Sequence, residues 1–260
     1  MSKILKIYLG LALLMASSLE SWAYEKFTAV DLGRVNATAP LYVLSNPSAK
    51  ATLILLPGGN ADTGKIAEGK PNSQNFLARS KDLFQLEGFN VVVMFRPTDL
   101  TDLETEYRVS KQHVQEIQQV IRFAKNEFNH PVWLVGTSRG TVSATASAIQ
   151  SGDAEIAGLV LSSSVTAKKN QGVSSQDISN IKVPVLVIHH QNDECRICNP
   201  DDAAQITKGL TSSPISKFVL VSGGFGPSGN PCEAKHWHGF INYENETVKL
   251  ISNWIKNPST

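Results

Sequence analysis

Residues 132–141 read VWLVGTSRGT, an apolar run followed by a serine between two glycines. Gly136 and Gly140 lie two positions before and after Ser138, and residues 141–150 are mostly small. Glycines at both positions let a strand and a helix approach closely across a sharp turn that leaves the serine hydroxyl exposed. The N-terminus of the helix favours negative charge developing near that hydroxyl. The segment therefore predicts a strand, a strained turn at Ser138 and a helix.

Segments of these two kinds alternate along the chain on both sides of the turn. Short apolar runs predict strands, and segments with apolar residues every three to five positions predict helices. The expected strands are 41–44, 51–56, 90–95, 132–136, 157–161, 183–189 and 217–221, and the expected helices are 75–87, 109–128, 140–150, 201–210 and 244–255. Strands that are apolar throughout are typical of a parallel sheet covered on both faces. The predicted fold class is α/β, a three-layer α/β/α sandwich with a mostly parallel central sheet.

The N-terminal segment has a different composition. Two lysines in residues 1–6 precede an apolar run over 7–16, and small residues, Ser21 and Ala23, stand near its end. This organisation is typical of a secretory signal peptide, and the apolar run is too short for a stable transmembrane helix. We therefore predict a signal peptide over residues 1–23 and a periplasmic or secreted location. The alternative is an uncleaved N-terminal anchor.

The whole chain has the composition of an ordinary globular protein, with 42% hydrophobic and 18% charged residues. A formal net charge of +1 gives no clustered positive field, so a nucleic-acid partner is not expected. Residues 24–260 have a length that suits one domain, and no stable membrane insertion is expected once the signal peptide is removed.

The candidate acid follows from the position of a strand end. A reactive serine needs a base to accept its proton, and the base needs a carboxylate to hold and stabilise it. Active sites in open parallel sheets form beyond the carboxyl ends of the strands. Asp193 comes directly after the predicted strand 183–189, so we predict that it is the acid. The adjacent Glu194 is the substitute.

Two histidines are placed suitably to act as the base. His236 and His238 follow the last predicted strand and precede the closing helix. We favour His238, because Gly239 gives it a flexible neighbour. His236 remains the alternative, since element boundaries are the least certain part of such a prediction.

The loop Pro57-Gly58-Gly59-Asn60 follows an early predicted strand. An oxyanion hole needs two backbone N–H groups aimed at the oxygen of a tetrahedral intermediate. We expect one from Arg139, directly after the nucleophile, and the other from Gly59, with Asn60 as the neighbouring choice.

Four motifs follow one another along the chain: LLPGGN (55–60), GTSRG (136–140), VPVLVIHHQNDEC (183–195) and HWHGF (236–240). With them the chain resembles the α/β-hydrolase superfamily over about residues 51–255. The chain looks most like compact exported bacterial esterases and dienelactone hydrolases. The resemblance implies a catalytic triad of Ser138, Asp193 and His238 and hydrolysis of a carboxylic ester through an acyl-enzyme. The short interval between residues 161 and 183 leaves no room for a large lid. One departure is that the oxyanion loop has Pro-Gly-Gly where many relatives have His-Gly.

Three cysteines lie in the C-terminal third of the chain, and export would permit a disulfide between them. A Cys195–Cys232 disulfide would join the loop of the acid to the loop of the base. The alternatives left open are a Cys198–Cys232 pair, a Cys195–Cys198 pair and free thiols.

The sequence says least about the substrate, which we expect to be a small-molecule ester. Asn60, Phe225, Trp237 and Phe240 are the candidate pocket residues, although the aromatic side chains can instead belong to the core. Arg139 can meet a substrate carboxylate or pair with a structural acid. The triad hypothesis needs no cofactor or metal. Two other classes remain open: a noncatalytic binding protein of the same fold, and a metal-dependent hydrolase that uses His189, His190, Asp193, His236 and His238.

Overall fold

The structure is a computed structural model that describes residues 22–151 and 155–259. The predicted signal peptide lies outside these residues, except for its last two positions. One sheet of eight strands runs through the described part of the chain in the order β1-β2-β6-β3-β7-β8-β9-β10. Its strands are β1 (Glu25–Arg34), β2 (Ala37–Leu44), β3 (Thr52–Leu56), β6 (Asn90–Met94), β7 (Val132–Thr137), β8 (Gly158–Ser162), β9 (Val185–His190) and β10 (Ser216–Val221).

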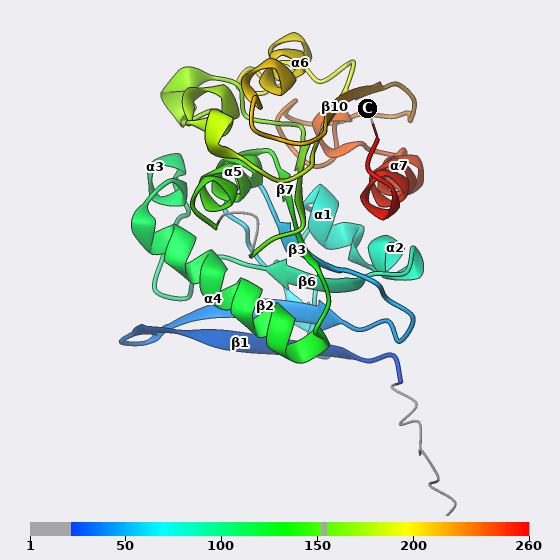
Figure 1. Cartoon of the computed structure of the whole chain (residues 1–260). Helices are drawn as coiled ribbons and strands as arrows, with labels where there is room; N and C mark the ends of the chain where they lie inside the picture. The colour runs from blue at the N-terminus through cyan, green and yellow to red at the C-terminus, as the bar shows by residue number, and fades with distance from the viewer. Residues whose placement is uncertain (1–21, 152–154, 260) are drawn as a thin grey trace, which may run out of the picture.

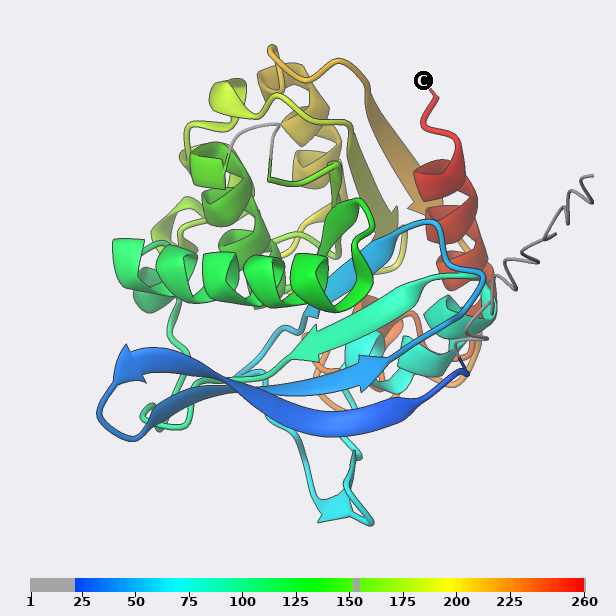
Figure 2. The same ribbon diagram turned by 60° about the horizontal axis from the view of Figure 1, so that its bottom comes forward.

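The pairing confirms a mostly parallel sheet. Every pair from β6 through β3, β7, β8 and β9 to β10 is parallel, and only β1–β2 and β2–β6 are antiparallel. The five central strands are buried along their whole length, as strands covered on both faces should be. A separate short hairpin, β4 (Ile66–Ala67) with β5 (Lys70–Pro71), projects from the body of the fold (Figure 2).

Helices cover both faces of the sheet (Figure 1). The α-helices are α1 (Phe76–Arg79), α2 (Lys81–Leu86), α3 (Thr105–Arg108), α4 (Lys111–Phe128), α5 (Arg139–Ser151), α6 (Pro200–Gly209) and α7 (Glu244–Lys256). Apolar residues of α4, α5 and α6 share one buried cluster with the sheet, and those of α1, α2 and α7 share a second cluster on its other face. These three layers are the predicted α/β/α sandwich.

No large lid interrupts the described sheet region. Between β8 and β9 the chain forms only three short 3₁₀ helices, η1 (Lys168–Asn170), η2 (Val173–Ser175) and η3 (Ile178–Asn180), and a fourth, η4 (Trp237–Gly239), precedes α7. Of the helices in the described residues, none is long and apolar enough to span a bilayer.

The structure differs from the sequence prediction at the N-terminal edge and in two helices. Strand β1 was not expected; it is an edge strand whose inner and outer residues alternate, so it lacks a continuous apolar run. The helix expected over 75–87 is divided at Ser80, which ends α1 and begins α2. The helix expected from residue 109 begins at Lys111 instead, because the Ser110 side chain accepts a hydrogen bond from the His113 N–H and caps it.

Candidate active site

Ser138 stands on the turn between β7 and α5, with a backbone φ of 52°. This left-handed conformation is strained for a residue other than glycine. The turn is held by a hydrogen bond from the Ser138 N–H to the Ser162 carbonyl oxygen, 3.0 Å away. Gly140 makes the close approach possible, because a Cβ atom there would lie 1.9 Å from the Leu56 carbonyl oxygen. The local geometry is that of the expected nucleophile turn.

Asp193 and His238 are in contact. Asp193 belongs to the loop after β9, and His238 belongs to η4 after β10. His238 Nδ1 donates a hydrogen bond to Asp193 Oδ2 across 2.8 Å, and both side chains are buried. The second histidine expected as a candidate, His236, is buried but makes no hydrogen bond to Asp193 in the described structure.

Asp193 has two further hydrogen-bond partners. His189 Nε2 donates to the same Oδ2 atom across 2.9 Å, and the Cys195 N–H donates to Oδ1, also across 2.9 Å. Burial alone would raise the pKa of Asp193, but the hydrogen bonds from His189 and His238 outweigh it and lower that pKa from 3.8 to about 2. The carboxylate is therefore ionised at neutral pH and can hold the His238 ring with its Nδ1 proton toward it.

Ser138 and His238 line one cavity of about 260 Å³. The buried Nε2 atom of His238 has no hydrogen-bond partner among the described residues, and no hydrogen bond joins it to Ser138. Such contacts are often long in unliganded enzymes and tighten when substrate binds. The free Nε2 atom is thus available to accept a proton from a group in this cavity.

The residues expected to supply the N–H groups of an oxyanion hole line the cavities at Ser138. Gly59, Asn60, Ser138 and Arg139 together line the adjoining larger cavity. Within the described residues, no acceptor is recorded for the N–H groups of Gly59, Asn60 or Arg139. Gly58 packs so closely that a Cβ atom on it would lie 2.6 Å from Ser138 Cβ. The glycine loop is therefore in place beside the nucleophile turn.

No protein-family model matches the sequence, and comparison with curated proteins finds no match. Solved structures are similar. An esterase from Pyrococcus furiosus is 14% identical, with a TM-score of 0.63 over 90% of this chain and 91% of that one. An α/β serine hydrolase homologue from Coxiella burnetii is 15% identical, with a TM-score of 0.60 over 88% of this chain and 96% of that one. A dienelactone hydrolase from Anabaena variabilis is 13% identical, with a TM-score of 0.60 over 90% and 97%.

The chain has the α/β-hydrolase fold. The likeness extends over nearly all of each chain, and the sheet order and helix layers described above agree with it. At these identities the comparison shows the α/β-hydrolase fold alone. What the chain does with this fold depends on the side chains at its strand ends.

The expected disulfide is formed in this α/β-hydrolase fold. Cys195 and Cys232 are bonded, which ties the loop of Asp193 to the loop of His238. Cys198 is a buried free thiol. Burial raises its pKa well above the ordinary value, and a hydrogen bond with Ser138 offsets only part of that rise. The Cys198 sulfur therefore lies against Ser138 as a neutral thiol.

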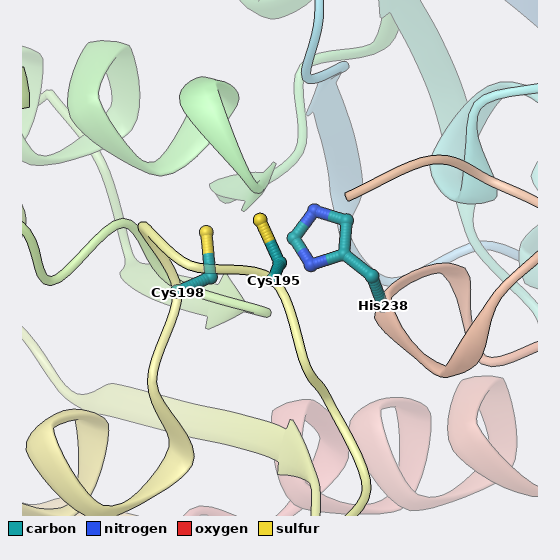
Figure 3. A group of neighbouring side chains, drawn as sticks. All are labelled: Cys195, Cys198 and His238. Atoms are coloured by element: carbon teal, nitrogen blue, oxygen red, sulfur yellow. The ribbon is translucent and has the colours of Figure 1, made fainter. Parts of the chain in front are cut away.

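Cys195, Cys198 and His238 lie close together (Figure 3), with their possible ligand atoms within 4.8 Å of one another. The chemistry of this donor set does not suit a metal, because Cys195 has no thiolate while its sulfur is in the disulfide. The five residues considered as an alternative metal site are divided among separate contacts. His189 and His238 share Asp193, whereas His190 Nε2 lies 3.0 Å from the Gly223 carbonyl oxygen.

The aromatic candidates for the pocket do not line either cavity at Ser138. Phe240 is fully buried and packs against Phe76, with 4.8 Å between the ring centroids. Trp237 stacks on His190, also at 4.8 Å, and Phe225 is 71% exposed. These aromatic residues were candidates because they are near His238 in the sequence. In the fold their rings point toward the core or the solvent instead of into the cavities. Asn60 does line both cavities.

Arg108 is a buried residue that sequence reasoning missed. Its guanidinium group donates to the carbonyl oxygens of Gly59 and Leu103 and to Ser143 Oγ, across 2.8, 3.2 and 3.0 Å respectively. No carboxylate of the described structure pairs with it directly. It fastens the loop of Gly59 to the helices beneath, and no local pattern marks that contact, because Gly59 lies 49 residues away.

Proposed function

We propose that this protein is an exported serine esterase that forms an acyl-enzyme on Ser138. The contact between Asp193 and His238, beside a cavity that also holds Ser138 on its strained turn, carries the proposal. A binding protein of the same fold would have no need of an ionised buried acid bonded to a histidine at this position. The similarity in fold to esterases and serine hydrolases is consistent with the proposal.

The proposed reaction has two halves. Ser138 Oγ attacks the ester carbonyl carbon while His238 Nε2 accepts the hydroxyl proton, and Asp193 stabilises the imidazolium. The N–H groups of Gly59 and Arg139 stabilise the tetrahedral oxyanion. His238 then gives its proton to the departing alkoxide, so an alcohol leaves and the acyl group stays on Ser138. A water molecule, deprotonated by His238, releases the acid and restores the serine.

We also propose that the mature protein is a single domain over residues 24–260 and that it works in the periplasm or outside the cell. The predicted signal peptide and the Cys195–Cys232 disulfide support this location, since disulfides persist in oxidising compartments. Cleavage after residue 23 is tested by N-terminal sequencing of protein recovered from the exported fraction.

Labelling with a fluorophosphonate tests the proposed nucleophile directly. The reagent should add once per chain, and peptide mass spectrometry should place the adduct on Ser138. The variant Ser138→Ala should show neither the adduct nor hydrolysis of p-nitrophenyl acetate. A wild-type protein that takes up no label would favour the noncatalytic alternative, whereas ester hydrolysis that a chelator abolishes would favour a metal-dependent enzyme.

A further inference from the structure

Two cavities meet at Ser138. The larger has a volume of about 910 Å³ and the smaller about 260 Å³, and both are lined by Ser138 and by the Gly59 and Asn60 of the oxyanion loop. His238 lines only the smaller cavity. The base therefore stands on one side of the nucleophile.

This asymmetry assigns the two halves of an ester to the two cavities, given the proposed function. His238 must deliver a proton to the departing alkoxide oxygen, so the alcohol part has to lie on the side of His238. The acyl part, which stays on Ser138, then extends into the larger cavity. A volume of about 260 Å³ suits a small alcohol, and about 910 Å³ leaves ample room for the acyl chain.

The larger cavity is lined by three basic side chains, Arg139, Lys169 and Arg196. None of the three makes an ion pair or side-chain hydrogen bond recorded for the described residues. Two carboxylates share the cavity, but Asp62 is already paired with Arg96 at 2.7 Å, which leaves Glu194 alone against three cations. The acyl side of the nucleophile thus has an excess of unpaired positive charge.

The smaller cavity has the opposite character. Its lining contains no lysine or arginine and includes the carboxylate of Glu233, besides Asp62, which is paired with Arg96. A negative charge on the alcohol part of a substrate would therefore meet repulsion and no cation. Among the described residues, the large apolar side chains that line the larger cavity are Ile197 and Pro231.

We propose that the substrate is an ester whose acyl part ends in a carboxylate, a half-ester of a dicarboxylic acid with a small neutral alcohol. Arg139, Lys169 and Arg196 receive the distal carboxylate, and the alcohol leaves from the cavity of His238. The inference rests on the proposed function and adds to it the charge of the substrate and the side that carries this charge.

Two esters with equal acyl chains test the proposal. Monomethyl adipate and methyl hexanoate share a six-carbon acyl chain and the same leaving alcohol, and differ in the distal carboxylate. At low ionic strength we expect kcat/KM for monomethyl adipate to be about tenfold higher than for methyl hexanoate. The rates are measured as acid release in a pH-stat. The preference should shrink as salt is raised to about 0.5 M, because the cations of the cavity are open to solvent.

Variants of the cavity residues test whether the larger cavity causes the preference for monomethyl adipate. Arg196→Gln and Lys169→Gln should each lower the ratio of kcat/KM between the two esters about three-fold. Lys168→Gln is the matched control, since it removes an exposed positive charge one position from Lys169 and does not line the cavity. It should leave the ratio within the error of the wild-type value.

A second pair of esters tests the side on which the charge belongs. Phenyl acetate and 4-acetoxybenzoate share the acetyl group, and only the second has a carboxylate on its leaving group. We expect no preference for 4-acetoxybenzoate. Hydrolysis of methyl hexanoate with no preference for monomethyl adipate, or a preference for the anionic leaving group, would overturn this inference and leave the esterase proposal standing. Absence of all ester hydrolysis together with absence of a fluorophosphonate adduct would overturn both.

Discussion

The Nη2 atom of Arg108 lies 2.8 Å from the carbonyl oxygen of Gly59 and donates a hydrogen bond to it. Arg108 is fully buried, and burial lowers its pKa to about 9, so the group still carries its charge at neutral pH. A charge buried in this way beneath the loop of Gly59 has a cost in desolvation, which its hydrogen bonds partly offset. The contact fixes the direction of the Gly59 carbonyl group. It thereby fixes the direction of the Asn60 N–H group, which belongs to the same peptide plane.

We expect Arg108→Lys to lower kcat about tenfold with little change in KM, because a lysine cannot reach all three acceptors and the loop donors serve the transition state. Affinity for a boronic acid that mimics the tetrahedral intermediate should fall by the same factor. Ser143→Ala, which removes one acceptor and keeps the arginine, is the milder companion and should give a smaller effect in the same direction. A lower melting temperature with unchanged kcat would instead indicate a purely structural role.

The Arg108 network contains a second serine–histidine–carboxylate arrangement. His113 Nε2 lies 3.0 Å from Ser143 Oγ, and His113 Nδ1 lies 2.8 Å from Glu116 Oε2. The cavity beside it has a volume of only about 10 Å³, so no substrate fits. Burial lowers the pKa of His113, which keeps its ring neutral. We therefore predict that a fluorophosphonate labels Ser138 and leaves Ser143 unmodified, as peptide mapping of the labelled protein can establish.

Replacement of Asp193 should affect catalysis more than binding. Asp193→Asn keeps the size of the side chain but presents an amide where His238 needs a carboxylate, so kcat should fall by about 10³ to 10⁴. Steady-state kinetics with p-nitrophenyl acetate measures this loss. Asp201→Asn, an exposed acidic residue in the first turn of α6, is the control and should retain wild-type kcat. A loss of tenfold or less in Asp193→Asn would contradict the assigned role.

The lowered pKa of Asp193 also predicts how stability depends on pH. Its pKa is about 2 in the folded protein and 3.8 ordinarily, so the folded state holds the ionised form more strongly than the unfolded state does. The contribution, about 2 kcal/mol, is fully present above pH 4 and is lost as the pH falls from about 4 to about 2. Urea unfolding of wild type and Asp193→Asn across this range should show a pH-dependent difference. Parallel curves would count against a stabilised carboxylate.

Loss of the disulfide should lower stability. The bond joins residues 37 positions apart, and closing a loop of this length is worth about 4 kcal/mol in the chain-entropy model. Cys232→Ser should therefore have a lower melting temperature and reduced activity, because the loop of His238 loses its covalent tie to the loop of Asp193. Thiol titration in denaturant should give one free thiol in the wild type, from Cys198, and three after reduction. A wild-type count of three before reduction would exclude the bond.

The sequence predicted the central features of the fold because each had a local signal. The two glycines around Ser138 predicted the turn, and continuous apolar runs predicted the buried strands. Strand β1 had no such signal, since an edge strand alternates and resembles a polar segment. Ser80, which divides one expected helix in two, lies between Arg79 and Lys81 in a segment whose apolar residues keep helical spacing, so the sequence does not mark the division.

The sequence indicated which segments lie at the candidate site, but not which tertiary contacts their side chains make. Asp193 and His238 were chosen from their positions after strands, and the structure places these two side chains in contact. The direction in which a side chain points is set instead by tertiary packing. Phe240 is the example, because it follows His238 by two residues and yet packs in the core. His189 was a candidate only as a metal ligand, although it bonds to the same carboxylate oxygen as His238. Arg108 depended on a contact with a distant carbonyl, for which no sequence pattern exists.

The Cys195–Cys232 bond makes the choice of expression host part of every measurement described above. Protein prepared in a reducing cytoplasm would retain the sheet and the turn of Ser138, whose formation needs no cysteine. Its His238 segment, however, would be fastened only by noncovalent contacts. Two preparations of the same protein can therefore differ in specific activity. The number of free thiols should be measured for each preparation whose rate is determined.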